Sequence, residues 1–257
     1  MLRNVLATIT VTFIIIPAAA LLWRSIEQNA WQSTSIEAVQ AALFLSLLTS
    51  FISMLVILIL GTPLAYSLAT RPSWISTVIE MPIVLPPAVA GLGLLMAFGR
   101  RGILGQWLLK LGIVLPFTTA AVIIAQIFVA IPFFVRTAQV GFEAIPITLR
   151  EAAMVDGANA NAVFRHVTLP LAWRAILAGL LVAWARALGE FGATILFAGN
   201  LQGETQTMPL LVFAILERDL NAAIWTALIL VGVAMLVVIL SRWLTSSARA
   251  LDLEEHR

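Results

Sequence analysis

The chain has few of the residues on which soluble enzymes and metal proteins depend. It has no cysteine, so disulfides and thiolate metal sites are excluded. Its histidines are His166 and His256, which leaves little for a histidine metal cluster. It has no G-x-x-x-x-G-K-[ST], H-E-x-x-H or G-x-S-x-G sequence. We therefore expect no ATP site, no cofactor, no metal and no enzymatic centre on this chain itself.

Charge is scarce as well. Only 11% of the 257 residues are charged, 61% are hydrophobic, and the mean hydropathy is +1.02. A soluble domain carries roughly 25% charged residues. The net charge of +2 comes from scattered arginines that form no basic face, so nucleic acid is not an expected partner. This composition predicts an integral membrane protein.

Six apolar blocks follow one another along the chain. They cover about residues 5–23, 39–68, 74–98, 118–134, 175–197 and 222–243. A membrane-spanning segment must be helical when lipid surrounds it, because no water satisfies its backbone. We predict an all-α protein with six transmembrane helices, the first of them retained and not cleaved as a signal peptide. The second block exceeds one crossing, so its ends should project or tilt. Residues 210–216 are too short to span and are expected to be half-buried and external.

The positive side chains indicate the orientation. With the N-terminus inside, nine of the fifteen Lys and Arg residues are cytoplasmic, five are external and Arg186 is inside a span. Cytoplasmic loops are enriched in Lys and Arg, so this bias predicts that both termini are cytoplasmic. Arg100 and Arg101 violate the rule, which weakens the bias without reversing it.

Two blocks contain residues that are unusual in a membrane helix. Pro82, Pro86 and Pro87 fall within six residues of the third block, and proline removes a backbone donor and kinks a helix. They predict a bent or interrupted span that packs on protein or lines a cavity, with a simple packing kink as the alternative. Arg186 and Glu190 are four residues apart in the fifth block and should share a helix face. Since a charge near the bilayer centre costs about 2.5–3.5 kcal/mol, the two should pair, either as a pathway or gate element or as a packing contact.

A polar island separates the fourth and fifth blocks. It contains Glu151-Ala152-Ala153, then Asp156-Gly157, and later Leu169-Pro170. Gly157 can adopt the positive φ that ends a helix, and Pro170 suits the first turn of the next one. We expect Glu151 near the start of a short helix, where a carboxylate favours the helix dipole. The alternative is an ordinary interfacial loop.

The order E-A-A, three residues, Gly and then L-P closely resembles the EAA loop of ABC importer membrane subunits. R-A-L-G-E-F-G-A-T-I at 186–195 and G-E-T-Q-T-M-P-L at 203–210 are similar to the molybdate branch of these permeases. L-P-P at 85–87 and G-R-R-G-I-L-G at 99–105 fit the same branch. G-E-F-G is shared with sulfate and thiosulfate permeases, and tungstate is not separable from molybdate by these motifs. The chain departs from the pattern at Asn159-Ala160-Asn161.

The resemblance implies a type I importer-like fold, with residues 1–257 as one transmembrane permease domain in the cell membrane. It implies a cytoplasmic coupling loop at about 145–172 that contacts an ATPase. The implied contact or turn residues are Glu151, Ala152, Ala153, Asp156 and Gly157. The implied assembly is a homodimer in membrane lipid, with two copies of an ABC ATPase and an extracytoplasmic oxyanion-binding protein. An ion-coupled secondary transporter is the alternative from another class, but we find no internal repeat of the kind it would have.

Overall fold

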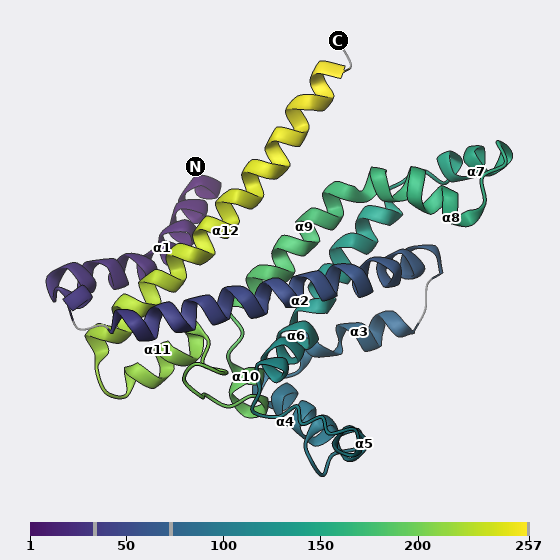
Figure 1. The fold of residues 1–257 in the computed structure, drawn as a ribbon. Helices are drawn as coiled ribbons and strands as arrows, with labels where there is room; N and C mark the ends of the chain where they lie inside the picture. The colour runs from purple at the N-terminus through teal and green to yellow at the C-terminus, as the bar shows by residue number, and fades with distance from the viewer. Residues whose placement is uncertain (33–34, 72–73, 256–257) are drawn as a thin grey trace.

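The fold is described from a computed structural model that places residues 1–32, 35–71 and 74–255 (Figure 1). Every regular element within those ranges is helical. Five helical runs are long and apolar enough to cross a membrane, and a sixth is obtained when α3 (Ile75–Val84) and α4 (Pro87–Phe98) count as one broken span. The predicted all-helical membrane fold is therefore confirmed. The long helices are α1 (Leu2–Glu27), α2 (Ile36–Thr70), α6 (Thr119–Glu143), α9 (Leu169–Leu188) and α12 (Leu220–Glu255).

Short elements connect the long helices. They are η1 (Ala30–Gln32), α5 (Gly105–Lys110), α7 (Ile147–Val155), α8 (Ala160–Val163), the π-helical segment η2 (Phe164–Thr168), α10 (Gly192–Phe197) and α11 (Met208–Leu216). In Figure 1, α7 and α8 stand at one end of α9, and α10 and α11 lie at its other end. The polar island and the loop at 199–207 are thus separated by the length of a membrane helix.

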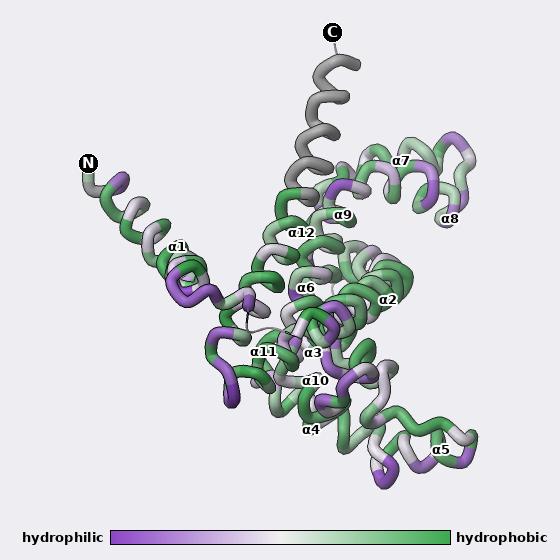
Figure 2. The backbone as a smooth tube through the Cα atoms, turned by 60° about the vertical axis from the view of Figure 1, so that its left-hand side comes forward, coloured by the Kyte–Doolittle hydropathy of each residue, from purple (hydrophilic) through white to green (hydrophobic). Residues whose placement is uncertain are grey.

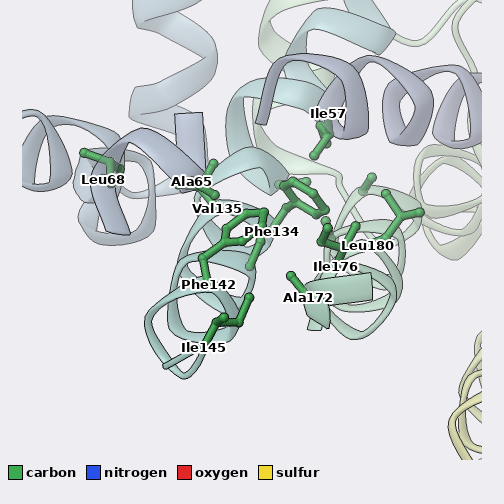
Figure 3. Packing of buried hydrophobic residues seen from close by; sticks show 14 residues of the cluster. Ile57, Ala65, Leu68, Phe134, Val135, Phe142, Ile145, Ala172, Ile176 and Leu180 are labelled. Atoms are coloured by element: carbon green, nitrogen blue, oxygen red, sulfur yellow. The ribbon is translucent and has the colours of Figure 1, made fainter. Parts of the chain in front are cut away.

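Helices α2, α6 and α9 form the centre of the bundle, where Phe134 of α6 is completely buried (Figure 3). Glycines let the backbones approach closely in this core. A Cβ on Gly61 of α2 would lie 2.6 Å from the Phe134 ring, and one on Gly141 of α6 would meet the Ala175 side chain. Small residues at such contacts let helices pack in lipid, where the hydrophobic effect gives little drive for association.

A ladder of buried hydroxyl groups on α2 holds its neighbours in register. Thr49 accepts a hydrogen bond from the Gln126 amide of α6 (3.2 Å), and Ser53 donates one to the Gln126 carbonyl oxygen (3.0 Å). Trp184 of α9 donates to Ser50 (2.9 Å). One turn earlier, Ser46 accepts from the backbone N–H of Met208 at the start of α11 (2.7 Å). Because each pairing satisfies polar atoms away from water, the ladder fixes how four helices meet.

Helix α1 lies apart from this core and packs against α12 and η1. Its apolar side chains, such as Phe13, Ile14 and Trp23, are largely exposed on the isolated chain. Figure 2 shows that the coloured parts of the long helices are mostly hydrophobic, and that hydrophilic residues gather in the connections and in the turn between α7 and α8. An apolar surface of this extent needs an apolar surrounding.

Three predicted blocks have different limits in the structure. The fourth extends beyond residue 134, because α6 continues to Glu143. The third breaks after Val84, because Leu85 precedes a proline and adopts an extended ψ of 130°. The fifth, predicted as one span over 175–197, ends as a helix at Leu188 and restarts at Gly192. Hydropathy averaged over a block does not register these breaks, because most of the residues around them are apolar.

The positive-inside bias predicts which face of the membrane each connection occupies. Since the chain has no cysteine, single cysteines report accessibility without background. We expect Gln202→Cys to react with an impermeant thiol reagent on intact cells, and Asn161→Cys and Ser247→Cys to react only after permeabilisation. The side chains of Gln202 and Asn161 are exposed, so neither substitution should disturb packing. The reverse pattern would invert the topology.

Candidate functional site: the polar island and the buried ion pair

The polar island folds as a helix, a turn and a second short helix. Helix α7 begins after Pro146 and ends at Val155, and Gly157, two residues later, has a φ of +91°. The Gly157 N–H donates to the Met154 carbonyl and the Ala158 N–H to the Ala153 carbonyl, both at 3.0 Å. This is a Schellman motif, in which the residue after the helix needs the left-handed conformation that glycine adopts freely. Gly157 therefore sets the direction of the turn.

Asparagine begins the second helix of the island. The Asn159 side-chain oxygen accepts a hydrogen bond from the Ala162 N–H at 2.9 Å, which caps α8. Asn159, the first residue at which the chain departs from the family pattern, is therefore the N-cap of α8. Local sequence therefore accounts for both sides of the turn.

Glu151 does not lie where the sequence interpretation placed it. Helix α7 begins at Ile147, so Glu151 is its fifth residue and no acidic residue occupies the first turn. The proposed interaction with the helix dipole is therefore wrong, because that effect fades beyond the first turn. The helix starts early because Pro146, whose φ is −54°, precedes it directly. The Glu151 and Ala152 side chains are instead exposed along the helix.

The outer surface of α7 combines charged and apolar side chains. Ile147, Leu149 and Met154 are about half exposed, and Val155 is 87% exposed. Glu151 and Asp156 are exposed among them. An apolar surface bordered by charges at the end of a polar loop is typical of a protein docking site. The structure contains no partner chain, so contact at Glu151, Ala152, Ala153, Asp156 and Gly157 stays a prediction.

A π-helical turn joins the island to the membrane helix α9. Pro170 was expected to begin the next membrane helix, and it is the second residue of α9 within one helical run over 160–188. Proline has no N–H and its ring collides with the carbonyl four residues back, which here belongs to His166. The wider η2 turn accommodates this, and the Leu169 N–H bonds to the Phe164 carbonyl five residues before it.

An aromatic cluster connects this turn to the core. The Phe164 ring of η2 lies 4.7 Å from Tyr66 of α2 and 6.4 Å from Phe142 of α6, measured between centroids. Tyr66 and Phe142 are themselves 5.5 Å apart. Contacts at these spacings stabilise beyond simple burial. The island is thus attached to the ends of α2 and α6 through side chains as well as through the backbone.

The Arg186–Glu190 pair lies at the break after α9, at the far end from the island. The Arg186 guanidinium is 2.7 Å from a Glu190 carboxylate oxygen, and the side chains are 28% and 1% exposed. The two residues do not share one helix, as the sequence interpretation supposed, because α9 ends at Leu188. The other Glu190 oxygen accepts the Ala193 N–H at 2.8 Å and so caps α10. Glu190 therefore joins the end of one helix to the start of the next.

The proline-rich break lies against this second break. Helices α3 and α4 bend by 117° at Leu85-Pro86, and Pro87 is the first residue of α4. Pro82 lies inside α3, so Pro86 and Pro87 carry the bend. A Cβ on Gly192 of α10 would lie 2.6 Å from the Pro87 side chain. We call the bend at residues 84–87 the elbow.

Helices α4 and α10 pack along each other beyond the elbow. A Cβ on Gly91 of α4 would lie 2.6 Å from the Ala193 carbonyl oxygen. Gly91 therefore allows the two backbones to approach closely at this contact. Gly93 does not contribute to it, because a Cβ there would meet nothing within 4 Å.

Two features of this region were missed in the sequence. One is the hydroxyl ladder of α2, whose signal is the spacing of Ser46, Thr49, Ser50 and Ser53 on one face of an apolar helix. The other is the aromatic cluster around Phe164. Its members come from three distant segments, so no local pattern indicates it.

A bundle of this topology, with two broken helices and an exposed helical hairpin at one end, has the architecture of an importer membrane subunit. The family described as "binding-protein-dependent transport system inner membrane component" matches residues 57–249, and the chain belongs to this family. It is a multi-pass inner-membrane protein of that family.

Relatives and solved structures agree with this assignment. The chain is 39% identical over 240 residues to the molybdenum transport system permease protein ModB of Mycobacterium tuberculosis, covering 89% of this chain and 88% of that one. It is 35% identical over 215 residues to ModB of Escherichia coli K12, covering 81% and 94%. The fold matches a bacterial ABC transporter involved in the import of alginate with a TM-score of 0.75, over 96% and 95% of the chains at 17% identity. The MetNI methionine ABC transporter matches with a TM-score of 0.62, over 84% and 97% at 17% identity.

Substitution of Gly157 tests the turn between α7 and α8. Gly157→Val forces a β-branched residue to a φ of +91°, which costs about 1–3 kcal/mol, so the turn should rearrange. We expect loss of ATPase co-purification and of transport. Gly157→Asn is the matched control, because asparagine tolerates this conformation and should keep most of both. Full activity of the valine variant would refute the role of the turn.

A double-mutant cycle tests the ion pair. Arg186→Gln leaves the Glu190 charge buried and unpaired, which should destabilise by roughly 3–5 kcal/mol. Glu190→Gln keeps an acceptor for the Ala193 N–H, so it isolates the charge interaction from the cap. The double variant should lose less thermal stability than the sum of the single variants. Additive losses in detergent would show that the charges do not stabilise each other.

Proposed function

We infer that this chain is the membrane-spanning subunit of an ATP-driven importer for molybdate or tungstate. The observation that carries the inference is its similarity, over almost nine tenths of both chains, to a permease named for molybdenum transport. The R-A-L-G-E-F-G-A-T-I and G-E-T-Q-T-M-P-L segments support the same substrate class. A sulfate or thiosulfate permease is the alternative, because G-E-F-G occurs in those permeases too.

The proposed assembly divides the work among several chains. Two copies of this subunit form a homodimer in the lipid bilayer, with both termini cytoplasmic. Two ATPase subunits bind the α7–α8 hairpins and hydrolyse ATP, so this chain contributes no catalysis. An extracytoplasmic binding protein delivers the oxyanion on the opposite side, where the loop at 199–207 lies at the other end of α9. Among the solved relatives of this fold is an alginate transporter in complex with a ligand-bound periplasmic protein.

Transport follows from two conformations with different affinities for these partners. Closure of the ATPase dimer moves the hairpins, and the attached helices alternate between inward- and outward-open arrangements. Support for a mechanical link comes from the Phe164 ring, which contacts Tyr66 of α2, and from the continuous helical run of η2 into α9. Glu151, Ala152, Ala153 and Asp156 are the proposed contact residues, and Gly157 is the proposed turn.

Reconstitution with the ATPase and binding protein encoded beside this chain tests the function. We expect ATP-dependent uptake of radiolabelled molybdate into proteoliposomes, abolished by an ATPase subunit with its phosphate-binding lysine replaced. Excess tungstate should block uptake and excess sulfate should not. Uptake of sulfate in preference to molybdate would establish the alternative substrate. Uptake driven by an ion gradient without ATP would refute the importer class.

A further inference from the structure

A small cavity opens at the elbow, and Arg186 reaches it from α9. Its volume is about 90 Å³. Its walls come from both sides of the elbow and from α6, and they include Pro82, Leu85, Pro87 and Phe133. The arginine is the one charged residue among the described residues that line the cavity. A cavity of this size with one guanidinium in its wall has room for a few water molecules or a small ion.

The Arg186 guanidinium has hydrogen-bonding capacity beyond its ion pair. Guanidinium carries five N–H donors, and one nitrogen is engaged by Glu190 at 2.7 Å. Glu190 is 1% exposed and uses its second oxygen for the Ala193 N–H, so it is committed to the protein. Arg186 is 28% exposed, and it is one of the residues that line the cavity. The remaining donors of Arg186 can therefore serve a ligand in the cavity.

A second pair of opposite charges lies on α3 and α6, two of the helices that line the cavity. Arg136 of α6 is 3.8 Å from Glu80 of α3, and both side chains are about half exposed. Glu80 is two residues before Pro82 and Arg136 is three residues after Phe133, and these two apolar residues line the cavity. An arginine–carboxylate pair thus occurs both at the cavity and on the helices that lead from it towards the proposed cytoplasmic side.

We propose that the elbow cavity is a contact site for the translocated oxyanion, and that Arg186 is the residue that binds it there. This rests on the proposed function and adds the place of contact. In apolar walls a guanidinium binds a tetrahedral oxyanion through charge-assisted hydrogen bonds. Glu190 holds the guanidinium in position and offsets its charge, which keeps the contact weak. A pathway needs that weakness, because an ion must leave a site as readily as it enters.

Removing both charges together tests the role of Arg186 in transport. The Arg186→Gln/Glu190→Gln variant leaves no unpaired buried charge and keeps an acceptor for the α10 cap, so it should fold and bind the ATPase. Molybdate uptake should fall about tenfold or more, because a charged hydrogen-bond partner is lost. The matched control is Arg24→Gln/Glu27→Gln, which removes an exposed pair at 3.1 Å and should transport normally. A folded double variant with normal uptake overturns the proposal.

A labelling experiment tests the site in the native background of Arg186. Ile83→Cys places a thiol at the cavity, and Val89→Cys is an exposed reference on α4 outside its lining. A sulfonate-bearing thiol reagent should react faster than a trimethylammonium-bearing one at Ile83→Cys only. Molybdate or sulfate should slow that reaction in purified protein. Equal reactivity with both reagents, or protection by phospholipid but not by oxyanion, overturns the proposal.

The two experiments separate this proposal from the proposed function. Protection at Ile83→Cys is measured without transport. A wild-type complex that imports neither molybdate nor sulfate would therefore refute the proposed function, and it would leave the result on oxyanion binding at the cavity unchanged. Normal wild-type import with no protection at Ile83→Cys and normal import by the double variant defeats the site alone.

Discussion

A helix that breaks inside an apolar environment leaves backbone groups without partners, and this chain solves that problem by placing two breaks against each other. The elbow between α3 and α4 packs on the break between α9 and α10, with Gly192 against Pro87 and Gly91 against Ala193. Glu190 accepts the Ala193 N–H in the first turn of α10, and Arg186 offsets its charge. Irregular backbone at membrane depth is tolerated only where protein or a cavity surrounds it. Each break therefore depends on the other.

The rest of the bundle keeps that arrangement in place by different means. The hydroxyl ladder of α2 binds α6, α9 and α11 through directional contacts, and Ser46 holds the start of α11. The glycine contacts around Phe134 add close packing without direction. Hydrogen bonds fix how far one helix is shifted along its neighbour. Apolar side chains do not fix this shift in a membrane, because lipid surrounds them as favourably as another helix does. These contacts join α2, α6, α9 and α11 into one frame.

The α7–α8 hairpin is connected to that frame at two places. The hairpin connects to α9 through a π turn and to α2 and α6 through Phe164, Tyr66 and Phe142. The π turn exists because Pro170 lacks an N–H, so a single proline shapes the link. At its other end, α9 reaches Arg186 and the elbow cavity. One helix thus connects the proposed ATPase contact to the proposed oxyanion contact.

The sequence by itself determined the membrane class, the apolar spans and the position of the polar island. These depend on composition and local pattern, as at Gly157, whose position after α7 requires a positive φ, and at Pro86-Pro87, which no helix interior accommodates. Only the tertiary structure decided that Glu190 lies beyond its helix and that Phe164 touches Tyr66. Hydropathy does not distinguish a continuous apolar helix from two that meet at a break. Which break packs on which, and which arginine reaches a cavity, depend on contacts between residues a hundred positions apart, and these form only when the helices assemble.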